Sequence, residues 1–191
     1  AIALHEKAEG LRIIDFGGAH GAQYDALRAV FGERIGSYTI VESPAVAAGL
    51  ADLGDDVLSW TSSAPEDLHR TFKGIDVAIA SSTIQYLPDP ENVTQGLAAV
   101  APFVVLDRLP LIDHHEHFVM QQHTRYDGKA VAYPAWFLSR VRFTAFLNQR
   151  DLRVISEWQV PEDAPFVLRR RRPNAGMLIE TPLAASSAAR T

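Results

Sequence analysis

The stretch Leu11–Gly21 constrains the fold more than any other part of the chain. Leu11, Ile13 and Ile14 form a short apolar run, long enough for one buried strand and too short for a helix. Three glycines follow within five residues, and then a helical pattern of apolar residues covers Ala22–Phe31. Strand, glycine-rich turn and helix in this order form the first half of a nucleotide-binding βαβ unit. Glycine is needed there because the backbone turns tightly and lets a ligand approach without a Cβ in the way.

Asp15 indicates which ligands this turn could bind, because its carboxylate stands two residues before the first glycine. A dinucleotide places its pyrophosphate over the helix N-terminus, where a preceding carboxylate would repel it. A carboxylate favours a ligand that presents cationic groups and hydroxyls. S-adenosylmethionine (SAM) has an ammonium, a sulfonium and a ribose diol, and it has no phosphate. The turn therefore favours SAM, with a purely structural glycine turn as the alternative.

Predicted strands and helices alternate along most of the chain. Further strands are predicted at Tyr38–Glu42, Asp56–Trp60, Ile75–Ala80, Phe103–Asp107, Leu152–Trp158 and Gly176–Glu180. Helical patterns cover Ala22–Phe31, Val46–Leu53, Ala64–Phe72, Pro90–Val100 and Trp136–Gln149. A hairpin is predicted from Phe118–Thr124 and Ala130–Tyr133, across the turn Tyr126–Lys129. The alternation predicts an α/β fold with a doubly wound, Rossmann-like sheet of seven strands.

The two ends of the chain carry separate expectations. Residues 1–9 predict the end of a helix that leads into the first strand. Because the chain begins with Ala1 rather than Met, we expect that it lacks an N-terminal helix. Residues 1–182 are predicted to form a single domain. Residues 183–191 are rich in alanine and serine and predict a disordered tail.

Composition excludes several classes of function. The 191 residues carry a net charge of −5, so general electrostatics favours neither nucleic acid nor an anionic membrane as a partner. The absence of cysteine excludes disulfides, thiolate zinc sites and a cysteine nucleophile. No apolar run reaches membrane-spanning length, and no secretory signal is present at the start. We therefore expect a cytoplasmic protein that acts on a small molecule.

Two residues at predicted strand ends are candidates for cofactor binding. Glu42 ends the second strand, where an acid in a nucleotide-binding fold accepts hydrogen bonds from the ribose hydroxyls. The alternative is a surface acid ahead of Pro44. Trp60 ends the third strand, where it could stack on adenine or belong to the core.

Several segments together resemble known enzymes. Asp15–Gly21 resembles the Asp/Glu-x-Gly-x-Gly-x-Gly loop of class I SAM-dependent methyltransferases. A set of segments is also similar to a family of inferred methyltransferases often associated with surface-polysaccharide genes. The set comprises Asp15–Gly18, Val41-Glu42-x-Pro44-Ala45-Val46, Gln85–Pro90, Leu106-Asp107-Arg108-x-Pro110-Leu111 and Tyr133–Ser139. The resemblance implies the class I methyltransferase fold, with its last strand antiparallel.

The resemblance also implies roles for individual residues. Asp15 and the three glycines would surround the methionine part of SAM, Glu42 would hold the ribose, and Ser81–Tyr86 would lie near the methyl group. The expected cofactor site comprises Asp15, Gly17, Gly18, Ala19, Gly21, Glu42, Ser43, Trp60, Ser81, Ser82 and Gln85. Ala19 replaces the middle glycine of the commonest loop, so its methyl group narrows the approach of the cofactor.

Methyl transfer to a hydroxyl needs a base that removes the acceptor's proton. Candidate bases near the expected substrate opening are His114, His115, His117 and Asp107. A solvated loop is the alternative for the histidines. A metal site is disfavoured because adjacent histidines in a strand point to opposite faces. Candidates for acceptor binding are Tyr86, Arg108 and Tyr133. The basic run Arg169–Arg172 could bind a phosphate, but a solvated turn ahead of Pro173 explains it better.

The leading prediction is SAM-dependent methyl transfer to a small molecule, with a sugar or related hydroxyl as the acceptor. A second hypothesis is a SAM-binding domain that has lost turnover and serves as a partner-binding module. An NAD-dependent reductase comes third, because Asp15 disfavours a pyrophosphate and the sequence lacks a Tyr-x-x-x-Lys pair.

Overall fold

The computed structural model describes residues 9–160, 166–167, 170–171 and 173–188, and it contains a seven-stranded sheet. The strand order is β3-β2-β1-β4-β5-β12-β9. These strands are β1 (Leu11–Phe16), β2 (Ile35–Val41), β3 (Leu58–Thr61), β4 (Val77–Ser81), β5 (Phe103–Leu109), β9 (Arg153–Val160) and β12 (Asn174–Glu180). Strand β12 runs antiparallel to both of its neighbours, β5 and β9. The predicted α/β sheet of seven strands with an antiparallel last strand is therefore confirmed.

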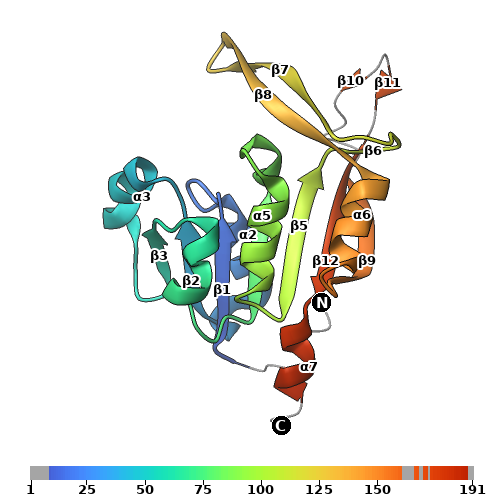
Figure 1. Cartoon of the computed structure of the whole chain (residues 1–191). Helices are drawn as coiled ribbons and strands as arrows, with labels where there is room; N and C mark the ends of the chain where they lie inside the picture. Colours follow the sequence, from blue (N-terminus) through green and yellow to red (C-terminus); the bar gives the residue numbers. More distant parts are fainter. Residues whose placement is uncertain (1–8, 161–165, 168–169, 172, 189–191) are drawn as a thin grey trace.

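Helices lie on both faces of the sheet (Figure 1). On one face, α2 (Ala22–Phe31) packs on a core cluster that includes Ile13, Tyr38 and Ile79. On the other face, the core contains residues of α4 (Leu68–Thr71), α5 (Pro90–Ala98) and α6 (Arg140–Asn148), packed against β1, β4, β5 and β12. Strands β1 and β4 are apolar on both sides because both of their faces are covered, as is usual for parallel strands.

The order of the strands places a topological switch point between β1 and β4. From β1 the chain first adds β2 and β3 on one side, and it then returns to add β4 and β5 on the other side. The parallel strands β1 to β5 end at the same edge, and ligands of open α/β sheets bind at that edge beside the switch point. The glycine turn and Glu42 follow two of these strands.

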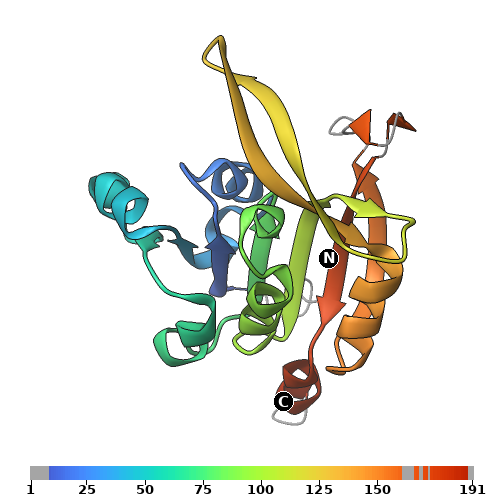
Figure 2. The same cartoon turned by 45° about the horizontal axis from the view of Figure 1, so that its top comes forward.

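The remaining elements are short connections and an inserted group of strands. The 3₁₀ helices are η1 (Gly32–Arg34), η2 (Ala51–Leu53), η3 (Pro65–Asp67) and η4 (Ile84–Tyr86), and the helices α3 (Pro44–Leu50) and α7 (Pro182–Ala188) complete the set. A three-stranded sheet consists of β6 (Leu111–Ile112), β7 (Phe118–Tyr126) and β8 (Lys129–Ser139). The hairpin β7–β8 stands away from the main sheet in two views (Figures 1 and 2).

Two predicted helices differ from the structure. The segment Ala64–Phe72 forms η3 followed by the short α4 instead of one helix. The helix predicted over Trp136–Gln149 begins only at Arg140, where the side chain of Ser139 accepts a hydrogen bond from the Arg142 N–H. Within this helix, the apolar residue Val141 is 70% exposed. The preceding apolar residues instead extend β8, which pairs with β7 on one side and β6 on the other.

Three predictions concern the chain ends and the basic run. A disordered tail from residue 183 is wrong for residues 183–188, which belong to α7, while residues 189–191 lie outside the described part. The predicted end of an N-terminal helix covers residues 1–9, of which residues 1–8 lie outside the described part, as do residues 169 and 172 of the basic run. Between them, β11 (Arg170–Arg171) pairs with β10 (Phe166–Val167), so a strand stands where we predicted a turn. Within the described residues, no helix combines the length and hydropathy needed to span a membrane.

Candidate functional site

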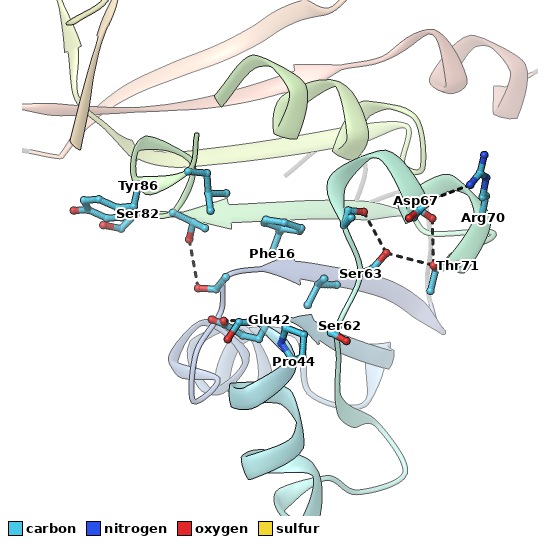
Figure 3. Close-up of a pocket in the computed structure, with 16 residues that line it drawn as sticks. Phe16, Glu42, Pro44, Ser62, Ser63, Asp67, Arg70, Thr71, Ser82 and Tyr86 are labelled. Carbon is cyan, nitrogen blue, oxygen red and sulfur yellow. Dashed lines mark hydrogen bonds and ion pairs between the residues drawn. The ribbon is translucent and has the colours of Figure 1, made fainter. Parts of the chain in front are cut away.

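A cavity of about 900 Å³ opens at the edge of the sheet where β1 to β4 end. Its volume is in the range of small-molecule and cofactor sites. Figure 3 shows its lining residues, with Glu42 and Pro44 on one side of Phe16 and Asp67, Arg70 and Thr71 at the end away from Tyr86. The lining comprises Phe16, Gly17, Val41, Glu42, Ser43, Pro44, Ser62, Ser63, Ala64, Asp67, Arg70, Thr71, Ser82, Thr83, Tyr86 and Leu87. Five predicted site residues are among them, namely Gly17, Glu42, Ser43, Ser82 and Tyr86.

The glycine turn is packed too tightly for side chains at two positions. A Cβ on Gly17 would lie 2.2 Å from the Thr83 side chain, and φ at Gly17 is +76°. A Cβ on Gly18 would lie 2.4 Å from Oδ2 of Asp15. Both glycines are therefore required by the protein's own packing. The sequence predicts them for two reasons, a tight turn, which the φ of Gly17 bears out, and the approach of a ligand, which stays a prediction.

Asp15 lies beneath the turn, with only 1% of its surface exposed. Its Oδ2 accepts a 2.7 Å hydrogen bond from the Tyr38 hydroxyl, while Oδ1 has no hydrogen-bond partner among the described residues. Burial raises the pKa of Asp15 to about 6, against the opposing effect of the Tyr38 hydrogen bond and with a small contribution from Glu42. A carboxylate in this position favours a positive charge nearby, although Asp15 does not itself line the cavity.

Glu42 connects the ends of β1 and β2. Its Oε1 accepts a hydrogen bond from the Ala19 N–H at 3.1 Å, and its Oε2 accepts one from the Ser43 N–H at 3.0 Å. These contacts fix the carboxylate at the cavity wall. An ionised carboxylate has about four acceptor sites, so two oxygens held in this way can still accept bonds from a ligand's hydroxyls. This geometry allows the ribose role of Glu42, which stays a prediction.

The wall next to Glu42 contains residues that the sequence analysis missed. Ser62 and Ser63 follow β3 directly, and the rule that ligands bind at the carboxyl ends of strands could have identified them. At the far end, Asp67 is paired with Arg70 at 2.9 Å, and Thr71 lies 3.3 Å from the Ser63 hydroxyl. No sequence signal identifies this last group.

The opposite wall begins at the end of β4. Ser82 adopts a left-handed conformation with φ of +54°, and its N–H donates to the Asp107 carbonyl at 3.0 Å. This conformation is costly for a residue with a Cβ, and such residues cluster at functional sites. Thr83 and the η4 turn follow and carry Tyr86, which is 39% exposed, into the lining.

Three predicted site residues, Ala19 and Gly21 of the glycine turn and Trp60 of β3, are outside the cavity lining. The Trp60 indole N–H donates to the Ala19 carbonyl at 2.8 Å, and the ring packs on the core beneath α2. Of the two readings considered for Trp60, this contact favours the core over adenine stacking. Gly21 caps the start of α2 with φ of +89°. Ala19 has φ of +47°, a left-handed value that a glycine adopts without strain.

Ser81 and Asp107 lie on the other face of the sheet, around a second pocket of about 250 Å³. The Ser81 hydroxyl donates to Asp107 Oδ2 at 3.3 Å and accepts a bond from Gln23 at 3.1 Å. The Trp158 indole N–H donates to Asp107 Oδ1 at 2.9 Å. Asp107 is thus held by neighbours on the α2 side, and it is not among the residues that line the larger cavity.

Gln85 and Arg108 connect the η4 turn to the end of β5. The Gln85 amide donates to the Arg108 carbonyl at 3.3 Å, and Gln85 is only 3% exposed. Arg108 has φ of +58° and pairs with Asp107 at 3.7 Å. Neither residue lines the cavity. Tyr133, on β8, contacts Tyr86 edge to face at a ring distance of 5.3 Å.

The predicted histidine bases lie elsewhere. His117 Nδ1 accepts a 2.8 Å hydrogen bond from the Ser139 N–H, and its Nε2 lies 3.3 Å from Glu91. His117 thereby lines a separate pocket of about 360 Å³ between α5 and α6. His114 accepts from the Glu116 N–H at 3.1 Å, and His115 is exposed. None of the three lines the cavity at the switch point, and within the described residues no group of three or more acidic or imidazole ligands could hold a metal.

Comparison with known proteins identifies the fold. No protein-family model and no curated protein matches the sequence at a significant level. Among solved structures, an S-adenosylmethionine-dependent methyltransferase from Mesorhizobium loti superposes with a TM-score of 0.61 at 14% identity, over 94% of this chain and 96% of that one. The chain has the class I methyltransferase fold.

Two further solved structures share this fold. The N-terminal domain of EvdMO1, with S-adenosylhomocysteine bound, has a TM-score of 0.57 at 15% identity, over 92% of this chain and 75% of that one. The [4+2]-cyclase SpnF has a TM-score of 0.62 at 12% identity, over 94% of this chain and 78% of that one. The fold is thus found in a methyltransferase and in a cyclase, so the function has to be argued from the site.

Proposed function

We propose that this chain binds SAM in the cavity at the switch point and transfers its methyl group to a small-molecule acceptor. The observation that carries the proposal is the position of Glu42. It stands at the end of β2, held by backbone N–H groups, in one cavity with the glycine turn and above the buried Asp15. A ligand with a ribose diol and positive charges fits these groups. The fold, shared with a SAM-dependent methyltransferase, supports the same ligand.

Different residues of the cavity would bind different parts of the cofactor. Glu42 would accept hydrogen bonds from the ribose hydroxyls. The hydroxyls of Ser62 and Ser63 offer further hydrogen bonds at the end of β3. The turn at Gly17, with the negative charge of Asp15 beneath it, favours the cationic methionine end. These assignments keep the predicted roles of Glu42 and the turn, and they add two serines.

When bound, SAM supplies a methyl group on a sulfonium, which forms a bond to the acceptor while the electrons of the broken C–S bond stay on sulfur. The protein has to hold the acceptor in line with that bond and exclude water. For a hydroxyl acceptor, the proton passes to a base or to water. None of the four predicted bases, His114, His115, His117 and Asp107, lines the cavity. The role of base for any of them stays a prediction. The resemblance to a family associated with surface-polysaccharide genes favours a sugar hydroxyl as acceptor.

A SAM-binding module without methyl transfer is the second candidate. One observation favours it: the two carboxylates in the lining are already engaged, Glu42 with two N–H groups and Asp67 with Arg70. Neither is therefore a free base. A domain of this kind would bind SAM with the same residues and release no S-adenosylhomocysteine.

Titration calorimetry with S-adenosylhomocysteine tests the proposed binding site. If Glu42 accepts the ribose hydroxyls, Glu42→Gln weakens binding by about 1.5–3 kcal/mol, the range for a hydrogen bond to a charged group. Glu33→Gln, at a side chain that is 96% exposed, serves as the matched control and leaves the affinity unchanged. Equal affinity of wild type and Glu42→Gln would exclude Glu42 from the site. A screen for S-adenosylhomocysteine release from SAM then separates the enzyme from the module.

A further inference from the structure

The hairpin β7–β8 is attached to the wall of the cavity at its base. The Tyr86 ring meets the Tyr133 ring edge to face, with centroids 5.3 Å apart, and the Tyr86 hydroxyl donates to Gln122 Oε1 at 3.3 Å. The Trp136 indole N–H donates to the Leu87 carbonyl at 3.1 Å. Tyr86 and Leu87 both line the cavity. The inserted hairpin and the cavity therefore share a border.

The register of the hairpin shows which of its faces meets that border. Gln122 and Tyr133 are directly opposite in the β7–β8 ladder, so they share a face, and both reach Tyr86. Trp136 lies three residues beyond Tyr133 and so points to the other face. The η4 turn and Leu87 thus contact both faces of β8, and the face of Gln122 and Tyr133 lies against Tyr86 of the cavity wall.

Between its base and its tip, this face of the hairpin is uncharged and amphipathic. From the base outward, its pairs are Phe118–Phe137, Met120–Ala135, Gln122–Tyr133 and Thr124–Val131. The opposite face carries His123 and Arg125, whereas Lys129 lies on the Tyr133 face, at the tip of the hairpin. An aromatic ring, an amide and a hydroxyl together suit a neutral ring that bears a hydroxyl group. Burial, and the presence of Tyr86, raise the pKa of Tyr133, so its hydroxyl stays a neutral hydrogen-bonding group at neutral pH.

We propose that Tyr86, Gln122 and Tyr133 form the acceptor site, and that it takes an uncharged ring bearing a hydroxyl, either a phenol or a sugar. The ring packs against the tyrosines, and the amide of Gln122 bonds the hydroxyl. This inference rests on the proposed function, because the acceptor has to stand beside bound SAM. It deepens that function by keeping the predicted acceptor residues Tyr86 and Tyr133, adding Gln122, and leaving out Arg108.

Saturation-transfer NMR tests the acceptor site without requiring turnover. The protein is first titrated with S-adenosylhomocysteine and then offered four probes: 4-ethylphenol, methyl β-D-glucopyranoside, 4-hydroxybenzoate and D-glucuronate. We expect at least one of the two neutral probes to bind, and to bind more tightly than its carboxylated counterpart. Binding of 4-ethylphenol would identify the acceptor ring as a phenol, and binding of methyl β-D-glucopyranoside would identify it as a sugar.

Two neighbouring glutamines offer a matched pair of variants. Gln122→Ala, on the face with Tyr133, should weaken the neutral probe about fivefold, the effect of one hydrogen bond. Gln121→Ala, on the opposite face, should have no effect. Tyr133→Leu should weaken the probe about tenfold, and Tyr133→Phe should retain it. All four variants should bind S-adenosylhomocysteine like the wild type, which also shows that they are folded.

The outcomes separate this inference from the proposed function. If wild type binds S-adenosylhomocysteine but Gln121→Ala and Gln122→Ala behave alike, the hairpin face is not the acceptor site. Equal or tighter binding of the carboxylated probes, or binding of none of the four, overturns the assigned acceptor class. If wild type does not bind S-adenosylhomocysteine at all, the proposed function itself fails.

Discussion

The buried carboxylate of Asp15 makes the stability of the folded protein depend on pH. Burial raises its pKa from 3.8 to about 6 in the folded state, and the unfolded chain keeps the ordinary value. The folded protein therefore binds this proton more tightly than the unfolded chain. Its contribution to stability is fully present below about pH 4 and is lost as the pH rises to about 6. The difference between the two pKa values corresponds to about 3 kcal/mol.

Asp15→Asn removes this dependence and keeps an acceptor for the Tyr38 hydroxyl. We expect the free energy of unfolding of the variant, relative to wild type, to rise by about 2.5 kcal/mol between pH 4 and pH 7.5. Urea unfolding at the two pH values measures it. Asp25→Asn, at an exposed position of α2, is the control and should show no such change. The same variant-to-wild-type difference at both pH values would show that Asp15 is not a buried, proton-binding group.

For single residues, the sequence predicted where site residues lie better than it predicted why each residue type is needed there. Glu42 lines the cavity at the strand end where the pattern placed it. Gly17 and Gly18 are needed as predicted, but their close neighbours are Thr83 and Asp15, which no local pattern reveals. Trp60 packs against the core beneath α2 and bonds the carbonyl of Ala19, 41 positions away, a contact that no local pattern reveals.

Among the elements, the junction of β8 and α6 depends on His117. Its Nδ1 accepts from the N–H of Ser139, a residue with 0% exposure, and its Nε2 then carries the proton that faces Glu91. His117→Ala leaves that N–H buried without a partner. We expect the free energy of unfolding to fall by about 1–3 kcal/mol, as measured in urea, with the affinity for S-adenosylhomocysteine unchanged.

The neighbouring histidine provides the comparison for this variant. His115→Ala, at an exposed position, should change neither quantity. A stable His117→Ala with a strongly reduced rate of methyl transfer would instead return His117 to the role of base.

Helices and strands were predicted correctly where the sequence fits only one periodicity, either helical or extended. Strands β4 and β5 are short apolar runs between turn signals, and they form as expected. Trp136–Ser139 satisfies both a helical and an extended pattern. Pairing with β7 and β6 decides for the strand, and such long-range partners are invisible in a local window. The far end of the cavity depends on Asp67 and Arg70, whose contact arises only once η3 and α4 have formed.

At the scale of the whole molecule, the order of the strands creates the site. The reversal between β1 and β4 brings together the turn after β1, the acid after β2, the serines after β3 and the turn after β4. The alternation of strands and helices, with the position of Asp15, was enough to predict this edge as the ligand site. The face of the sheet on which each strand-end side chain lies was not predictable, and Ser81 and Asp107 therefore lie around a different pocket.

Thermal unfolding with added ligand tests the central claim, that this cavity binds SAM. A ligand at about 100 times its dissociation constant adds about 2.7 kcal/mol to the free energy of unfolding, which corresponds to a rise in Tm of roughly 5–10 °C for a chain of this size. We expect such a rise with SAM and with S-adenosylhomocysteine, and none with NAD. A rise with NAD alone, or no rise with either SAM or S-adenosylhomocysteine, would contradict the account.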